Sequence, residues 1–260
     1  MSLRQTYKTP ALKETEMTSP PTFSVMELPK LHPGDREKAR WMLLAERYRA
    51  LRLRSLKVAP EAFASTYEVE SQRGLDRTLD RLSNPKARHF VAVAGERAGQ
   101  LGVPSDVNIE DICEREWVGM IVLIGPIEDS IMANQDPLKT AASGGEQSIE
   151  TTSADDQRRR GCSVEFVING IFVELAVRGQ GIGKALVDTA LAQARSRGVG
   201  QGTDICVTVL VNEENQEAHK LYERAGFEVV GREFYRQESG GLSDECRAEE
   251  RVALKMRLVC

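Results

Sequence analysis

The chain has 260 residues, of which 41% are hydrophobic and 28% charged, a balance typical of one globular domain with insertions or of two domains. Its formal net charge of −4 argues against a nucleic-acid partner, and no apolar run approaches the roughly 20 residues that a membrane span requires. The five cysteines are scattered without a Cys-x-x-Cys pair, which indicates a reducing compartment, cytoplasmic or nuclear, with neither a disulfide framework nor a zinc site.

The N-terminal part predicts a leader, one strand and two helices. Residues 1–22 carry Thr, Ser, Pro and Lys without periodicity, so we expect a disordered leader. Residues 23–28 predict a first strand, and Asp35 is expected to cap the long helix that follows. A break at 60–67 separates this helix from a second one that runs to Leu82.

Apolar, β-branched runs predict further strands at 90–94, 117–124, 164–173, 205–211 and 252–259. A helix with apolar residues at every fourth position follows the third of these runs and stops at Gly198. The segment 128–160 is rich in Ser, Thr, Gly, Asp and Gln, which predicts a disordered loop inserted into one domain that spans 23–260.

A glycine-rich turn after the strand at 164–173 is the strongest local signal. The segment Arg178-Gly179-Gln180-Gly181-Ile182-Gly183-Lys184 places three glycines at alternate positions, where an amphipathic helix begins. Glycines leave no Cβ in front of the backbone N–H groups, and these groups are unsatisfied donors at the positive end of the helix dipole. The turn is therefore predicted to bind a pyrophosphate.

Two nucleotide-binding motifs fit this turn poorly. A Walker A loop needs Gly where Arg178 stands and Ser or Thr where Ala185 stands, so a phosphate-binding NTPase is disfavoured. A dinucleotide fingerprint needs a third glycine where the chain has Lys184, counting from Gly179, or Leu186, counting from Gly181. The pattern Arg-x-x-Gly-x-Gly remains.

A second segment, Asn215-Gln216-Glu217-Ala218-His219-Lys220-Leu221-Tyr222-Glu223-Arg224-Ala225-Gly226-Phe227, follows the strand at 205–211. Asn212 or Asn215 can cap a short helix and Gly226 can end it, and Ala218, Leu221 and Tyr222 fall on one face. The two segments together resemble the acetyl-CoA motifs of the GCN5-related N-acetyltransferase (GNAT) superfamily, Arg-x-x-Gly-x-Gly and Asn-x-x-Ala-x-x-Leu-Tyr-x-x-x-Gly-Phe.

The resemblance implies the α/β fold of the GNAT acyl-CoA transferases, a central mixed twisted sheet of about six to seven strands flanked by about four helices. It implies an N-acetyltransferase that transfers an acetyl group from acetyl-CoA to a primary amine by direct attack, without a metal, on a small amine or a peptide amine. A homodimer is compatible with it. The alternative is a non-catalytic CoA-binding module of the same fold.

The resemblance also assigns the cofactor contacts. The main chain of Phe172 and Val173 would pair with the pantetheine arm, Asn215 would support that arm, and Ala218 would let the second helix come close. The pyrophosphate would lie on the turn formed by Arg178, Gly179, Gln180, Gly181, Ile182, Gly183 and Lys184. Leu175 stands where the family usually has proline, which is expected to loosen the turn.

For the chemistry, Tyr222 is predicted to contact the cofactor and to protonate the departing thiolate, since a thiol pKa near ~8.5 and a phenol pKa near ~10 are close. Glu165 is the first candidate for the base, with Glu174 and water as alternatives. Strand parity places the two glutamates on opposite faces unless a bulge intervenes. Phe63 and Tyr67 are predicted to border an acceptor site suited to a cationic amine.

Overall fold

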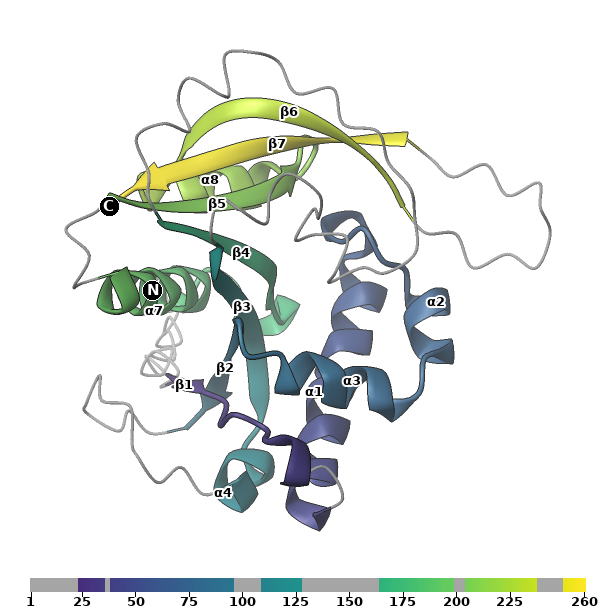
Figure 1. The fold of residues 1–260 in the computed structure, drawn as a ribbon. Helices are drawn as coiled ribbons and strands as arrows, with labels where there is room; N and C mark the ends of the chain where they lie inside the picture. Colours follow the sequence, from purple (N-terminus) through teal and green to yellow (C-terminus); the bar gives the residue numbers. More distant parts are fainter. Residues whose placement is uncertain (1–22, 36–37, 96–108, 128–163, 199–203, 238–249) are drawn as a thin grey trace, which may run out of the picture.

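A computed structural model describes residues 23–35, 38–95, 109–127, 164–198, 204–237 and 250–260 (Figure 1). The predicted leader at 1–22 and the predicted loop at 128–160 lie outside these residues.

One seven-stranded sheet organises the described chain, in the order β1-β2-β3-β4-β5-β7-β6 (Figure 1). Its strands are β1 (Phe23–Glu27), β2 (Ala87–Ala94), β3 (Trp117–Ile127), β4 (Val164–Val173), β5 (Ile205–Asn212), β6 (Glu228–Arg236) and β7 (Glu250–Val259). All neighbours pair antiparallel except β4 and β5, which are parallel. The predicted mixed sheet is therefore confirmed.

Six α-helices accompany the sheet in the described residues, where about four were expected: α1 (Ala39–Val58), α2 (Tyr67–Gln72), α3 (Leu75–Ser83), α4 (Ile109–Glu114), α7 (Ile182–Gly198) and α8 (Gln216–Arg224). The predicted second helix is two helices, because Arg73 and Gly74 have extended backbone angles. The prediction that Asp35 caps α1 is wrong: the N-cap residue is Lys38, and Asp35 forms an ion pair with the Lys38 side chain.

Two hydrophobic cores lie on opposite faces of the sheet, one under α7 and one under α1 and α3 (Figure 1). The predicted apolar stripe of α7 is buried in the first core, where it packs against β4 and β5, and consists of Ile182, Leu186, Ala190 and Ala194. Leu44, Tyr48 and Leu51 of α1 are buried in the second core. Among the described helices, none combines the length and the apolar character of a membrane span.

Three cysteines lie in the described residues. Cys113 and Cys260 are free, and burial raises the pKa of the Cys113 thiol to about 11. Cys206 is disulfide-bonded, which the scattered spacing of the cysteines did not predict.

Candidate active site

The parallel strands β4 and β5 stay paired over only half of their length. Their pairing runs from Val164 with Ile205 to Ile168 with Val209. Beyond that point β5 remains paired with β7 and β4 remains paired with β3. Residues 169–173 of β4 and 210–212 of β5 therefore face each other without a shared ladder. We call this opening the open end of the sheet; a free strand edge there can pair with an extended ligand.

A β-bulge shapes β4 at this opening. Met120 of β3 pairs with Phe172 and Val122 pairs with Asn169, so Gly170 and Ile171 together oppose one residue of β3. Gly170 has φ +63°, a backbone angle that favours glycine. The extra residue shifts the side-chain alternation of the strand by one position.

This shift overturns the predicted placement of the two glutamates on opposite faces. Below the bulge, Phe166 and Ile168 point into the α7 core, so Glu165 faces the α1 side. Above the bulge, Phe172 belongs to the α1 core, and Glu174 pairs with Arg54 of α1. Glu165 and Glu174 therefore share one face, but they lie at opposite ends of the strand.

The glycine turn presents a row of free backbone donors. Within the described part of the chain, the N–H groups from Gly179 to Lys184 make no hydrogen bond, and the first bond into α7 runs from Ala185 N to Gly181 O. Gly179 and Gly181 have φ +79° and +85°, angles that other residues adopt only with strain. The turn thus exposes free donors at the start of a helix, an arrangement that suits an anion.

The two cationic side chains of the turn already have partners. Arg178 Nε donates to the Val173 carbonyl at 2.9 Å, which ties the turn to the end of β4. Lys184 pairs with Asp188 one helical turn further along α7. Because these contacts are exposed, each can be exchanged for a phosphate oxygen at small cost.

The second predicted segment folds as α8 and lies beside the turn. The Asn215 side chain accepts a hydrogen bond from Ala218 N at 3.1 Å, so Asn215 is the N-cap of this helix. A Cβ added at Gly183 would lie 3.4 Å from the Leu221 side chain, which shows how closely α8 packs on the start of α7. The structure therefore brings the two motifs together.

Tyr222 is buried in the α7 core with 1% of its surface exposed. Its ring meets Phe227 edge-on, with the ring centroids 5.3 Å apart. Its hydroxyl has no hydrogen-bond partner among the described residues, and burial raises the pKa of the phenol. Leaving a buried hydroxyl unpaired costs about 1–3 kcal/mol, so the site fits a ligand that supplies an acceptor atom here.

Neither glutamate is placed beside Tyr222 by a described contact. Glu165 accepts a hydrogen bond from the Thr208 hydroxyl at 3.1 Å, where β4 and β5 are still paired. Val173 lies eight residues further along β4, which at ~3.3 Å per residue is roughly 26 Å. Glu174 lies at the open end, and its carboxylate pairs with Arg54.

The predicted acceptor residues contact cations of α1 that sequence reasoning missed. The guanidinium carbon of Arg52 lies 4.4 Å from the centroid of the Phe63 ring, and Lys57 Nζ lies 4.8 Å from that of Tyr67. The four-residue spacing of Tyr48 and Arg52 could have indicated that they share a face of α1. Nothing in the spacing shows that Phe63 folds back onto that face.

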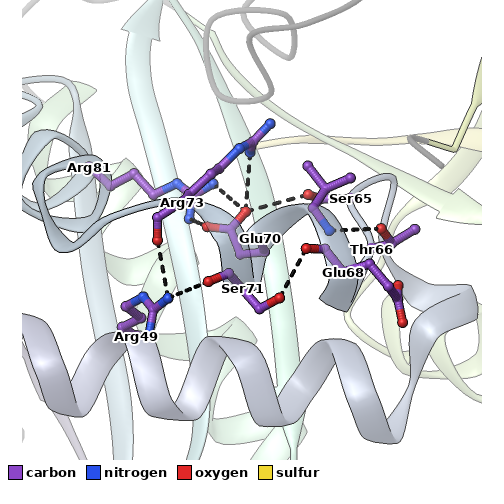
Figure 2. Close-up of polar contacts among 9 residues, drawn as sticks. Arg49, Ser65, Thr66, Glu68, Glu70, Ser71, Arg73 and Arg81 are labelled. Atoms are coloured by element: carbon purple, nitrogen blue, oxygen red, sulfur yellow. Dashed lines mark hydrogen bonds and ion pairs between the residues drawn. The ribbon is translucent and has the colours of Figure 1, made fainter. Parts of the chain in front are cut away.

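Behind these residues, a buried carboxylate joins α2 to α3 (Figure 2). Glu70 accepts hydrogen bonds from Arg73 Nη1 at 3.2 Å and from Arg81, whose Nη2 lies at 3.0 Å, in a two-pronged contact. The Ser65 hydroxyl donates to it at 3.4 Å. Burial acts to raise the pKa of Glu70, but the hydrogen bonds and charge of Arg81 hold it below its usual value. Arg81 is thereby fixed on the α1 side of the sheet.

His89 of β2 connects this cluster to α1. Its Nε2 lies 3.0 Å from the Arg81 carbonyl, which can only accept, so Nε2 carries the proton. Its Nδ1 then accepts from the Tyr48 hydroxyl at 3.1 Å. Burial lowers the pKa of His89 to about 4, so the ring is neutral at neutral pH.

A pH-dependent stability follows from His89. Since the unfolded chain binds this proton near pH 6.5 and the folded chain only near pH 4, stability present above pH 6.5 is lost as the pH falls toward 4. We expect a loss of about 3 kcal/mol from this group. Urea unfolding at a series of pH values checks it. The slope in this window should be shallower in His89→Gln; parallel curves for the two proteins would contradict the assignment.

Comparisons with known proteins show which protein family part of this chain resembles. Residues 144–229 match the family model described as an acetyltransferase (GNAT) domain. Over 65 residues, or 25% of this chain, the sequence is 40% identical to peptidyl-lysine N-acetyltransferase YjaB of Salmonella typhimurium and 35% identical to YjaB of Escherichia coli. The aligned stretch covers 38% and 37% of those relatives, so the chain spans less than two-fifths of their length. These matches support the predicted resemblance to the GNAT superfamily over residues 144–229, and the seven-stranded mixed sheet agrees with the predicted fold.

Among solved structures, Arabidopsis thaliana NAA60 in complex with a bisubstrate analogue aligns with 91% of this chain and 99% of its own, at a TM-score of 0.49 and 15% identity. A ribosomal-protein-alanine N-acetyltransferase from Brucella melitensis aligns with 84% of this chain and 96% of its own, at 0.46 and 18%. Likenesses of this size carry no argument about activity or acceptor.

Proposed function

We propose that this protein is an acetyl-CoA-dependent N-acetyltransferase that transfers the acetyl group to a primary amine by direct attack. The observation that carries the proposal is the set of free N–H groups from Gly179 to Lys184, which lies beside the open end of the sheet. The turn provides for a pyrophosphate, and the free edge of β4 provides for an extended arm. The YjaB relatives, which are named as peptidyl-lysine N-acetyltransferases, support the reaction class.

In this proposal the glycine turn binds the pyrophosphate, while Phe172, Val173, Asn215 and Ala218 line the path of the pantetheine arm. Acetyl-CoA supplies an activated acyl group in the form of a thioester. The amine nitrogen bonds to the acyl carbon as the C–S bond breaks, and the amine loses one proton. Tyr222 delivers a proton to the departing sulfur. Because burial raises its pKa, the phenol is protonated at neutral pH but is a weaker acid than a free phenol, so proton delivery must accompany C–S bond breaking.

Three groups are candidates for the base that accepts the proton from the amine. Glu165 remains the sequence-based candidate, but its distance along β4 requires a chain of water molecules to reach an amine at the open end. Glu174 lies at the open end of the strand, where its carboxylate pairs with Arg54. Water at the open end is a third route for the proton. Comparing the pH profiles of kcat for Glu165→Gln and Glu174→Gln separates these routes.

The first test is acetyl-CoA binding by calorimetry. We expect saturable binding, and we expect Gly181→Ala to raise the Kd about tenfold, because a Cβ at φ +85° is strained and turns the N–H groups away from the ligand. Gly34→Ala is the matched control, since its added Cβ meets nothing within 4 Å and its φ is not positive. No saturable heat at millimolar acetyl-CoA would rule out the proposal. Binding without thiol release in the presence of amines would instead identify a CoA-binding module.

A further inference from the structure

A cavity of about 560 Å³ lies on the α1 side of the sheet. Tyr48 and Arg52 of α1 and Arg81 of α3 contribute to its wall, and Asn169 and Gly170 of the β4 bulge reach it from the sheet. The volume falls within the ~300–1,000 Å³ typical of small-molecule sites. Because the bulge begins the free edge of β4, a molecule in this cavity would lie next to the open end of the sheet.

Among the guanidinium groups around the cavity, that of Arg52 has no carboxylate partner in the described residues. Arg81 shares the single carboxylate of Glu70 with Arg73 (Figure 2). Arg77 and Asp80 line the cavity with opposite charges. Arg52 makes no hydrogen bond or ion pair through its guanidinium with any residue that the structure describes, and its one recorded contact is with the Phe63 ring.

The position of Arg52 suits it to bind an anion from the cavity. One face of its guanidinium rests on Phe63, which leaves the N–H fork free. Its Nη1 lies 3.9 Å from the point that a Cβ of Gly170 would occupy, so the fork reaches the bulge. Burial, and next the charge of Arg81, lower the pKa of Arg52 to about 10, so the guanidinium is still charged at neutral pH. A planar fork of this kind matches a carboxylate in a two-pronged contact.

We propose that this cavity is the acceptor site and that Arg52 binds a carboxylate of the acceptor, so that the substrate class is a small amine bearing a carboxylate, as in an amino acid. The inference rests on the proposed N-acetyltransferase function. It adds a carboxylate to the predicted cationic amine, because Arg52 and Lys57 already lie over the rings of Phe63 and Tyr67. The cavity is built from residues 48–89, 120–124 and 169–170, most of which lie outside the segment matched by the family.

The test compares each acid with the same amine lacking its carboxylate. Thiol release from acetyl-CoA is measured with lysine against cadaverine, ornithine against putrescine, and phenylalanine against phenethylamine. We expect each acid to be the better substrate. In Arg52→Met the KM for the acids should rise about 10- to 100-fold, as expected for losing hydrogen bonds to a charged group. The KM for the decarboxylated amines and the Kd for acetyl-CoA should not change.

Two variants keep the result interpretable. Arg40→Met removes one positive charge from the exposed start of the same helix and should leave every constant unchanged. Arg52→Lys retains the charge without the fork and should lie between wild type and Arg52→Met. Melting temperatures of all three show whether each variant is folded.

The outcomes separate this inference from the proposed function. Two results would count against the carboxylate: acetyl-CoA binds and releases its thiol equally well with acids and with decarboxylated amines, or it does so only with peptides as acceptors. Either result means that the carboxylate assignment is wrong and that the proposed N-acetyltransferase function stands. Titration of the CoA-bound protein with the acids gives a second readout. Equal affinity for the acids in wild type and Arg52→Met, or no binding in either, would also overturn the carboxylate assignment. If acetyl-CoA itself does not bind, the proposed function fails, and the inference fails with it.

Discussion

Replacing Tyr222 by phenylalanine is expected to lower kcat by ~10²–10⁴-fold, the usual contribution of a positioned general acid. The Kd for acetyl-CoA should stay nearly unchanged, because the ring and its packing against Phe227 are retained. The same substitution removes a buried hydroxyl that has no partner among the described residues. We therefore expect the variant to be about 1 kcal/mol more stable to unfolding than the wild type.

A slower and more stable enzyme is an unusual combination, and it distinguishes a chemical role from a structural one. Steady-state kinetics and urea unfolding on the same preparation measure both quantities. Phe227→Leu is the control, since it loosens the packing of the Tyr222 ring and keeps its hydroxyl. It should lose stability and retain most of its turnover. Unchanged kcat in Tyr222→Phe would remove the phenol from the mechanism.

Replacing Glu70 by glutamine is expected to destabilise the protein by about 3–5 kcal/mol, because breaking a buried ion pair leaves charge without compensation. Arg73 and Arg81 would both lose a carboxylate that is 4% exposed (Figure 2). Chemical denaturation at neutral pH measures the change. Since the pKa of Glu70 is held below its usual value, the effect should shrink as the pH falls below the ordinary Glu range.

Glu68 offers a matched control on the same helix. It is exposed, so Glu68→Gln should change the unfolding free energy by no more than about 0.5 kcal/mol. Equal losses in the two variants would mean that the buried cluster does not hold α2 and α3 together. A loss confined to Glu70→Gln would show that Arg81 owes its position beside the cavity to this carboxylate.

The glycine turn and α8, which form the candidate cofactor site, were predictable from sequence because their determinants are local. The glycine turn, the N-cap at Asn215 and the apolar stripe of α7 each depend on residues within one or two helical turns. Short spacing encodes such features directly. The boundaries of β4 and the end of α7 at Gly198 were predicted correctly for the same reason.

The candidate acceptor site was not predictable, because it depends on contacts between distant elements. Arg52 lies over Phe63, and Glu70 binds Arg81 from the neighbouring helix. No spacing rule indicates these pairs. One extra residue in β4 reversed the side-chain parity beyond it, which is why Glu174 lies on the face opposite to the predicted one. Gly74 was the available signal that the second helix divides in two.

The presence of separate cores on the two faces of the sheet has an evolutionary consequence. Mutations in α1 or α3 repack one core and leave the layer beneath α7 untouched, since effects at sites without shared partners are largely independent. Under the proposed function, the side that selects the amine can therefore change without disturbing the side that binds acetyl-CoA. The match to the family, confined to residues 144–229, is the pattern that this division would leave in a lineage.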